Sequence, residues 1–335
     1  MRAVKIGAPG GLDRVHVVEV EDPGPPRAGE IRVRIHASSL NYHDMSVVKG
    51  IIPSADGRIP MADGAGVVEA VGAGVEEFAE GDHVVSCFFP DWQAGEPQFA
   101  DFSRVPGDGM DGYAVETVVR PATWFTHAPE GWSHGEAATI TTAGLTAWRL
   151  LVVEGGLKAG DAVLALGTGG VSIYALQIAK AMSAEVIVTS SSNDKLERAR
   201  GLGADECINY RETPKWGDAV RKRTGGRGVD QVIEVGGPGT LAQSIKAARV
   251  GGHIGLVGVL TGIAGDVPTA ALMRRQQKLH GVLVGSREHQ LDFVRALEAM
   301  KIRPVIDRTF PLEQIADAFR YEESGRHFGK ICLEF

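Results

Sequence analysis

The feature that most constrains the fold is a short, wholly apolar run, Ala162–Leu166, followed at once by a glycine-rich turn at 167–170. A strand that is apolar throughout is buried on both faces, as in a parallel sheet. Apolar residues then recur at helical spacing over 171–182, and 186–188 is the next apolar run. Strand, tight turn, helix and strand make a βαβ unit, which is expected to be right-handed.

The same alternation continues along the chain. Strands are expected at 232–235, 254–257 and 280–285, and a helix over 196–202 can be capped by Asn193 or Asp194 and ended by Gly203. Residues 1–125 differ, because Ile31, Val33 and Ile35 alternate with polar residues and further short strands are expected at 67–72 and 83–85. Helices are expected over 290–300 and 312–321, with a final strand near 331–333.

This pattern predicts an α/β protein with two domains. A β-rich domain spans 1–127 and is completed by 286–335, whereas 128–285 forms a doubly wound parallel sheet. Proteins of this length commonly have about two domains.

Composition excludes several classes of function. The formal net charge is −7, so no basic surplus is available to neutralise phosphates, and no nucleic-acid partner is expected. None of the three cysteines, Cys87, Cys207 and Cys332, lies in a CxxC pair, which argues against a cysteine zinc cluster. No run approaches the roughly 20 apolar residues that span a bilayer, and no signal peptide is evident, so a cytoplasmic protein without membrane contact is expected.

The turn after the first apolar strand predicts a phosphate site. Gly167 allows a tight turn, Gly169 lets the backbone approach a pyrophosphate, and Ser172 replaces the third glycine of the usual pattern. The amides at the start of the following helix favour an anion. The backbone at Thr168, Gly170 and Val171 completes this expected dinucleotide site.

The second strand ends at Ser190 without the acidic residue that an NAD site would place there. Hydroxyl groups of Ser190 and Ser191 with the charge of Lys195 can bind a 2′-phosphate, which predicts a preference for NADP(H). The alternative is that these serines only cap a helix and that Lys195 is solvated.

Several motifs resemble one known family. They are VVEAVGAGV at 67–75, GDHV at 81–84, AGLTAW at 143–148, GTGGV at 167–171, GAD at 203–205, INY at 208–210 and HFGK at 327–330. Together they resemble the medium-chain dehydrogenases/reductases, and most closely the zinc-free branch of quinone oxidoreductase-like and zinc-independent alcohol dehydrogenase-like proteins. The resemblance implies a GroES-like catalytic domain, a Rossmann cofactor domain, NAD(P)H and a homodimer.

The chain departs from the zinc-dependent relatives at their ligands. Asn41 stands where they have a cysteine, Ala62-Asp63 where they have His-Glu, and Thr142 lies near their third ligand. An amide, a methyl group and a hydroxyl cannot rebuild a site that needs about three His, Cys or carboxylate ligands. The stretch 88–113 also lacks the cysteines of their structural zinc lobe. No catalytic or structural zinc is therefore expected.

The resemblance also implies roles for individual residues. His43 is the expected proton donor, the alternative being a surface or hydrogen-bonded structural histidine. Tyr42 is the alternate donor, and Asn41 is expected beside the nicotinamide ribose. The resemblance adds Thr142, Thr146, Tyr210 and Lys330 as expected cofactor contacts. Further backbone contacts are expected where the late strands end, at the carboxyl edge that binds ligands in such sheets. These are Gly236, Val257, Gly258, Val259, Val284, Gly285 and Ser286. For Lys330 the alternative is an exposed tail charge. The aromatic segment 88–113 is expected to be a substrate lid or, equally, an aromatic packing loop or dimer contact.

Without a Lewis acid, a conjugated carbonyl is easier to reduce than a simple one, because it delocalises the developing charge itself. This favours an NADPH-dependent reductase of quinones or α,β-unsaturated carbonyls. The alternatives are a zinc-free alcohol dehydrogenase or aldehyde reductase, and a cofactor-binding structural or regulatory protein with little activity.

Overall fold

The computed structural model describes residues 1–97 and 102–335. The chain forms two compact units: Met1–Leu145 with Val284–Phe335, and Thr146–Leu283. This division falls at 145/146 and 283/284. The domain limits predicted from the sequence, near residues 127 and 286, remain a prediction. In the described part of the chain, every helix is too short or too polar to cross a membrane.

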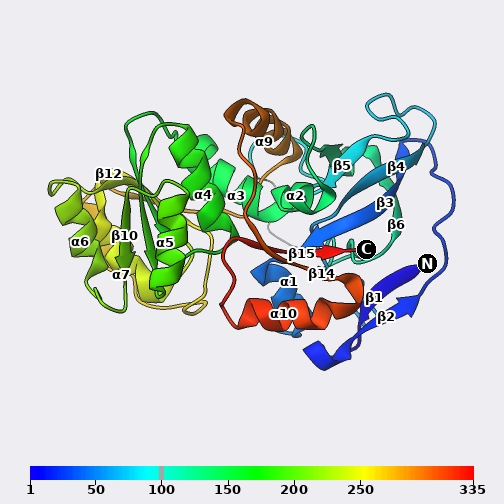
Figure 1. The fold of residues 1–335 in the computed structure, drawn as a ribbon, viewed down its shortest axis with the longest axis horizontal. Coiled ribbons are helices and arrows are strands. Elements are labelled where there is room, and N and C mark those ends of the chain that lie inside the picture. Colours follow the sequence, from blue (N-terminus) through cyan, green and yellow to red (C-terminus); the bar gives the residue numbers. More distant parts are fainter. Residues whose placement is uncertain (98–101) are drawn as a thin grey trace. The chain divides into compact units, whose positions relative to one another are not determined.

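The unit Thr146–Leu283, coloured green to yellow in Figure 1, contains a six-stranded parallel sheet. Its strand order is β10-β9-β8-β11-β12-β13. The strands are β8 (Ala162–Leu166), β9 (Glu185–Ser190), β10 (Glu206–Asn209), β11 (Val229–Glu234), β12 (Ala248–Leu256) and β13 (Lys278–Gly281). The helices are α4 (Gly170–Ala181), α5 (Asn193–Gly201), α6 (Trp216–Arg223), α7 (Pro238–Ala247) and α8 (Thr269–Arg274). The expected doubly wound α/β sheet is confirmed.

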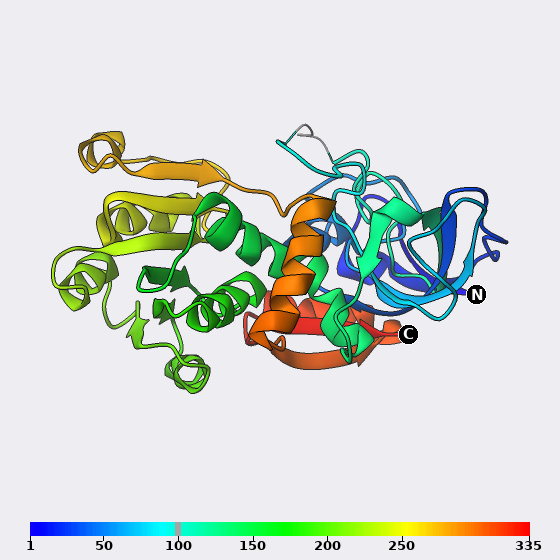
Figure 2. The same cartoon turned by 90° about the horizontal axis from the view of Figure 1, so that it is seen from above.

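Helices flank both faces of this sheet (Figures 1 and 2). The strand order moves outward from β8 through β9 to β10 and then crosses back to β11. Right-handed connections therefore put α4 and α5 on one face and α6 and α7 on the other. Each of the two layers buries an apolar side of the sheet, as the fully buried β8 and β11 require.

Two local expectations for this unit are wrong in detail. Ser192, rather than Asn193 or Asp194, is the N-cap of α5, because its hydroxyl accepts the amide of Lys195. The last strand ends at Gly281, so residues 284–286 lie beyond it in an irregular segment before α9 (Arg287–Met300).

The other unit is built on a second sheet, in the order β14-β15-β3-β4-β5-β7 with β6 also paired to β3. Its strands are β3 (Glu30–Ser39), β4 (Ala65–Val71), β5 (His83–Ser86), β6 (Thr117–Pro121), β7 (Phe125–His127), β14 (Ile306–Pro311) and β15 (Lys330–Glu334), and β1 (Arg2–Ile6) pairs with β2 (Val15–Glu19) in a separate hairpin. The helices are α1 (Tyr42–Val48), α2 (His134–Ala138), α9 and α10 (Ile315–Glu323). The alternation seen at Ile31, Val33 and Ile35 matches their burial in the core of this unit.

One helical stretch was not expected from the sequence. After α2, residues Ile140–Gly144 form a π-helical turn, α3 follows at Leu145–Trp148, and a second π-helical turn covers Arg149–Glu154. π-helical turns are rare and occur often at functional sites.

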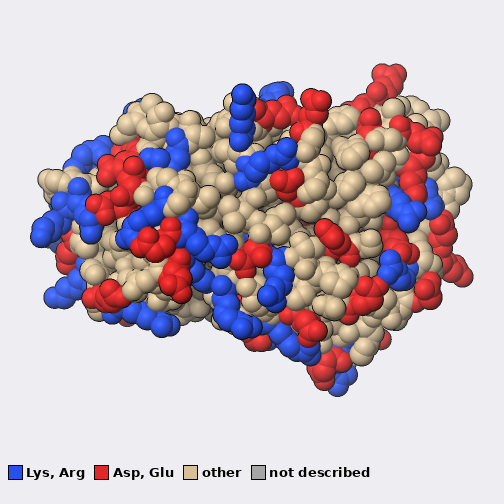
Figure 3. All heavy atoms as spheres, viewed as in Figure 1, with Lys and Arg blue, Asp and Glu red and all other residues tan. Residues whose placement is uncertain are grey.

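On the face shown in Figure 3, basic and acidic side chains are mixed rather than gathered into one basic surface.

Candidate active site

The N-terminus of α1 is fixed by a buried carboxylate. Asn41 precedes the helix, and its backbone amide donates to Asp44 Oδ2 over 3.0 Å. The other oxygen, Asp44 Oδ1, accepts the amide of Ala62 at 2.9 Å. Asp44 therefore joins the start of α1 to the segment that contains Asp63, and both carboxylates are buried.

Asp63 is the centre of a buried polar network. Its Oδ2 accepts the Ser39 hydroxyl at 2.5 Å and the Asn41 side-chain amide at 2.9 Å. Its Oδ1 accepts the Thr142 hydroxyl at 2.6 Å. Burial raises the pKa of the Asp63 carboxyl, although the charge of Lys330 and the hydrogen bonds from Ser39 and Thr142 oppose that shift.

Lys330 enters the same network from β15. Its ammonium group donates to the Leu40 carbonyl oxygen and, over 2.6 Å, to Asn41 Oδ1. It also lies 3.9 Å from Asp63 Oδ2, and the side chain is only 3% exposed. The alternative of an exposed tail charge at Lys330 is therefore wrong, whereas its role as a cofactor contact stays a prediction.

His43, one residue into α1, forms a dyad with a carboxylate that the sequence did not single out. His43 Nε2 lies 3.0 Å from Asp108 Oδ2, and Asp108 is buried. The imidazole ring stacks on Phe102 and meets Phe88 edge-on. Burial alone would lower the pKa of His43, but the Asp108 hydrogen bond and the charges of nearby carboxylates outweigh it and raise that pKa.

The other candidate donor is more open, since Tyr42 is 52% exposed. The aromatic residues Phe88, Phe89 and Trp92 are buried and contact one another, which is the packing-loop arrangement. The proposed lid also includes residues 98–101, which lie outside the described residues.

In the sheet unit, the glycine-rich turn has the geometry that its sequence predicts. Gly167 has a φ of 76°, in the left-handed region that favours glycine, and Gly169 is the N-cap of α4. Ser172 donates its hydroxyl hydrogen to the Leu166 carbonyl oxygen at 2.6 Å. The serine thus ties the end of β8 to the first turn of α4, which explains why a third glycine is unnecessary.

The ends of β9 and β10 bring predicted 2′-phosphate contacts together. The amide of Tyr210 donates to the Ser190 carbonyl oxygen at 3.1 Å, and the Tyr210 side chain is exposed. The sequence missed a carboxylate beside them: Glu212 Oε1 accepts the side-chain amides of Asn193 at 2.9 Å and Asn209 at 3.0 Å.

The expected backbone contact at Gly236 already has a partner, as does the neighbouring Gly237. The amides of Gly236 and Gly237 both donate to Glu234 Oε1, at 2.8 and 3.0 Å. Residues 257–259 follow β12, and at Gly258 a Cβ atom would lie 2.1 Å from the Val235 carbonyl oxygen. Glycine is therefore needed there for two strand ends to approach closely, a requirement independent of any ligand.

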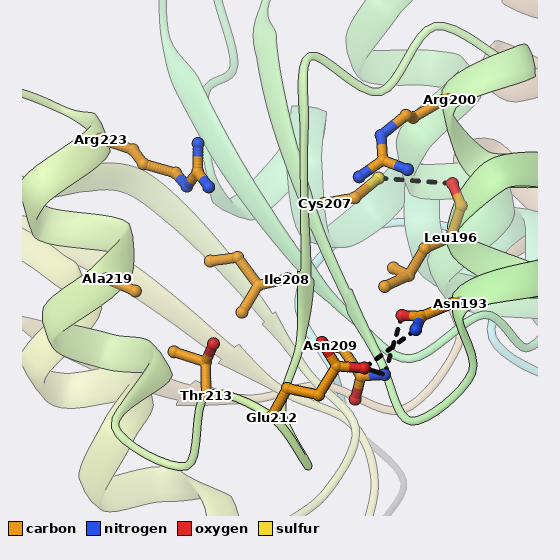
Figure 4. A pocket seen from close by; sticks show the side chains of 10 residues that line it. All are labelled: Asn193, Leu196, Arg200, Cys207, Ile208, Asn209, Glu212, Thr213, Ala219 and Arg223. Carbon is orange, nitrogen blue, oxygen red and sulfur yellow. Dashed lines mark hydrogen bonds between the residues drawn. The ribbon is translucent and has the colours of Figure 1, made fainter.

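A separate cavity of about 200 Å³ lies over β10, between α5 and α6 (Figure 4). Its lining includes Cys207, Arg200 and Arg223, and none of residues 167–171. In Figure 4, Asn193, Asn209 and Glu212 close one end through the hydrogen bonds described above. The cavity therefore does not coincide with the glycine-rich turn.

Comparisons with known proteins cover almost the whole chain. Residues 27–130 match the alcohol dehydrogenase GroES-like domain, and residues 170–301 match the zinc-binding dehydrogenase domain. A zinc-type alcohol dehydrogenase-like protein of Schizosaccharomyces pombe is 41% identical over 97% of this chain and 96% of its own length. The chain belongs to the medium-chain dehydrogenase/reductase superfamily. It is therefore an oxidoreductase of the zinc-type alcohol dehydrogenase-like group, and the GroES-like expectation is confirmed.

Two solved structures of this superfamily match the full chain. An NAD-dependent alcohol dehydrogenase is 38% identical with a TM-score of 0.91, and 100% of each chain is covered. The crotonyl-CoA carboxylase/reductase AntE in complex with NADP is 25% identical with a TM-score of 0.87, over 100% of this chain and 94% of that one. An NAD(P) cofactor is typical of the superfamily, and a small molecule is the substrate.

The ligand positions of zinc-dependent members of this superfamily do not fit a catalytic zinc in this chain. The side chains at these positions are the amide of Asn41, the methyl group of Ala62 and the hydroxyl of Thr142. The adjacent carboxylate of Asp63 already accepts hydrogen bonds from three side chains. Zinc sites in proteins use Cys, His or carboxylate ligands. Among the described residues, no group of three or more His, Cys, Asp or Glu side chains could hold a metal ion.

Proposed function

We propose that this protein is a zinc-free alcohol dehydrogenase or aldehyde reductase that prefers NADP(H). The observation that supports zinc independence is the hydrogen-bonded network of Asn41, Asp63, Thr142 and Lys330, which takes the place of metal ligands. The alcohol and aldehyde substrates are supported by the names of the relatives at 41% and 38% identity.

The nicotinamide cofactor, when bound, donates or accepts the hydride. The turn at Gly167 and the N-terminus of α4 would hold its pyrophosphate, and Ser190, Ser191, Lys195 and Tyr210 would hold the adenosine 2′-phosphate. The other expected contacts belong to the same proposal. Among them, Lys330 is buried and would act on the cofactor through Asn41 rather than touch it.

His43 is the proposed proton donor to the developing alkoxide. Because Asp108 takes Nε2, Nδ1 is the ring nitrogen that has no hydrogen-bond partner among the described residues. The proton would therefore leave from Nδ1, and Asp108 would keep the ring oriented and stabilise its charged form. Tyr42 is the second candidate, and Asn41 would orient the ribose through the free lone pair of its carbonyl oxygen.

A second candidate function is reduction of a quinone or an α,β-unsaturated carbonyl. The absence of Lewis-acid ligands at Asn41, Ala62 and Thr142 favours it, because conjugation spreads the charge that zinc would stabilise. The similarity to AntE, a crotonyl-CoA carboxylase/reductase, supports the same class of substrate.

A substrate panel decides between these functions. The purified protein is given NADPH or NADH with an aldehyde, an enone and a quinone, and NADP⁺ with a primary alcohol. Reduction of the aldehyde, unchanged by a chelator, is expected; faster turnover of the enone or quinone would favour the second candidate. Zinc that restores activity at one equivalent, or calorimetry showing no binding of either nucleotide, would refute both. Light scattering tests the predicted homodimer.

A further inference from the structure

A buried ammonium group lies beside Asp63 in the polar network. Lys330 Nζ has three acceptors close to it: the Leu40 carbonyl oxygen, Asn41 Oδ1 at 2.6 Å and Asp63 Oδ2 at 3.9 Å. An ammonium group is costly to bury unless it is paired and hydrogen-bonded. Here the ammonium group makes two hydrogen bonds and has a carboxylate nearby, so its charge is compensated.

The segments that meet at this ammonium are the same ones that would supply a metal site. Asn41, the Ala62-Asp63 pair and Thr142 stand at or beside the ligand positions of zinc-dependent relatives. In this chain, Asp63 joins Asn41 and Thr142, and Lys330 joins Asn41 and Asp63. The side chains at these positions therefore still contact one another, but through hydrogen bonds and an ion pair instead of a shared metal ion.

We propose that Lys330 is the built-in cation of this centre: its ammonium group neutralises Asp63, fixes the orientation of the Asn41 amide, and excludes a divalent metal ion from the same place. The metal-excluding part rests on the zinc-free reading of the proposed function. Lys330 is a positioning residue here, because it acts through Asp63 and Asn41.

The orientation of the Asn41 amide follows from the charges around it. Its nitrogen faces the carboxylates of Asp44 and Asp63, at 3.1 and 2.9 Å, and its oxygen faces the ammonium group. Turning the amide over would put its N–H donors against the ammonium and its oxygen against two carboxylates. Lys330 therefore makes one amide orientation strongly preferred.

The same charge opposes a metal ion. A dication bound by Asp63 would lie within a few ångströms of a fixed positive charge that is shielded from water. Only one carboxylate at these positions could help to offset that repulsion, since the other groups are an amide, a methyl and a hydroxyl.

The test is a double-variant cycle on the full chain, using Lys330→Met, Asp63→Asn and the two combined. Each single change leaves a buried charge without its counter-charge, so each should lower Tm by roughly 5 °C or more. The double variant removes both charges and should lose clearly less than the sum of the two. Lys49→Met is the matched control: it breaks the surface pair between Lys49 and Glu323 and should change Tm little.

Two further measurements test the other parts of the proposal. Retention of zinc tests metal exclusion, and the kinetic constants separate positioning of Asn41 from stabilisation of the fold. Elemental analysis of the wild-type protein after incubation with excess zinc and desalting should find no stoichiometric metal. The folded double variant, in which Asn41 Oδ1 has lost its donor, should lose about tenfold in kcat with the KM of the nicotinamide cofactor changed little.

Losses in Tm that simply add, one retained zinc per wild-type chain, or an unchanged kcat in the double variant would each overturn the proposal. The Tm and zinc measurements need no substrate. They therefore decide the role of Lys330 even if the substrate panel refutes the proposed function.

Discussion

His43 on α1 is held by Asp108 through a hydrogen bond of 3.0 Å between Nε2 and Oδ2, and the two residues are 65 positions apart in the chain. Asp108 lies in a tight turn that packs closely against the backbone of Met61. At Gly107, for example, a Cβ atom would lie 2.7 Å from the backbone nitrogen of Met61. The carboxylate is therefore placed by backbone that has little freedom to move.

The first prediction concerns this dyad. Asp108→Asn removes the interaction that raises the pKa of His43, so burial should then dominate and lower that pKa. Because the proposed donor is the protonated ring, carbonyl reduction should begin to fall at a lower pH than in the wild type. A pH profile of kcat, with an NMR titration of the ring, measures the shift.

Asp111→Asn is the control for that variant, because Asp111 is a partly exposed neighbour that pairs with Arg58. Its pH profile should match that of the wild type. If His43→Ala lowers kcat by less than a fewfold across the pH range, His43 is not the donor and Asp108 only supports the fold.

The second prediction concerns three stacked imidazole rings. His134, at the start of α2, stacks on His36 and on His83, with ring centroids 4.6 and 4.8 Å apart. Burial, followed by the neighbouring imidazoles, lowers the pKa of His134 to about 4. The unfolded chain therefore takes up a proton that the folded chain resists, and stability should be lost as the pH falls from about 6.5 towards 4.

His134→Phe keeps an aromatic ring in the stack and removes its titration. We expect this variant to lose about 1–2 kcal/mol less than the wild type between pH 7 and pH 4.5, after allowance for screening of a half-buried group. Denaturant unfolding at several pH values measures the difference. His16→Gln, at an exposed position of β2, should leave the wild-type pH dependence in place.

The third prediction concerns Glu322 on α10. Its Oε2 atom is buried and has no hydrogen-bond partner among the described residues. Burial raises the pKa of this carboxyl to about 8, against the opposing charge of Lys330. The folded chain retains a proton that the unfolded chain releases above about pH 4.3, so the group lowers stability progressively as the pH rises towards 8.

Glu322→Gln should therefore stabilise the protein by about 1–3 kcal/mol at pH 8 and have little effect near pH 4.5. Thermal unfolding at the two pH values is the measurement. Glu323→Gln, next in sequence but exposed and paired with Lys49, should show no such dependence on pH. An equal effect of Glu322→Gln at both pH values would contradict the prediction.

The fourth prediction concerns cofactor choice. Ser190→Asp puts a carboxylate at the end of β9, where it would repel a 2′-phosphate and accept hydrogen bonds from ribose hydroxyls. The ratio of kcat/KM for NADPH over NADH should fall at least about tenfold. Ser183→Asp, exposed before the other end of β9, is the control. An unchanged ratio in Ser190→Asp would show that Ser190 does not select the cofactor.

Much of the fold was predictable because its signals are local. The alternation at Ile31, Val33 and Ile35 gives β3, and the apolar run Ala162–Leu166 gives β8. The cap of α5 was misplaced, because residues 190–194 are all polar and several can cap a helix. The helical turns after α2 were missed, since Thr141 and Thr142 lower helix propensity and are held by hydrogen bonds to Ser86 and Asp63.

The candidate site was predictable only in part. Asn41, Thr142 and Lys330 were identified one by one, but not their meeting at Asp63. That meeting joins residues separated by 79 positions for Thr142 and Asp63, and by 289 for Lys330 and Asn41. Asp108 gave no signal at all, because a single carboxylate in a glycine-rich turn resembles any other surface loop.

The N-terminal sheet is completed by the last residues of the chain. β15 supplies both the Cys332–Ser39 pairing with β3 and the ammonium group of Lys330. During synthesis, the segment Thr146–Leu283 leaves the ribosome before the residues that close this sheet. The nascent N-terminal segment must therefore wait with an open strand edge and an uncompensated Asp63 until β15 has been synthesised.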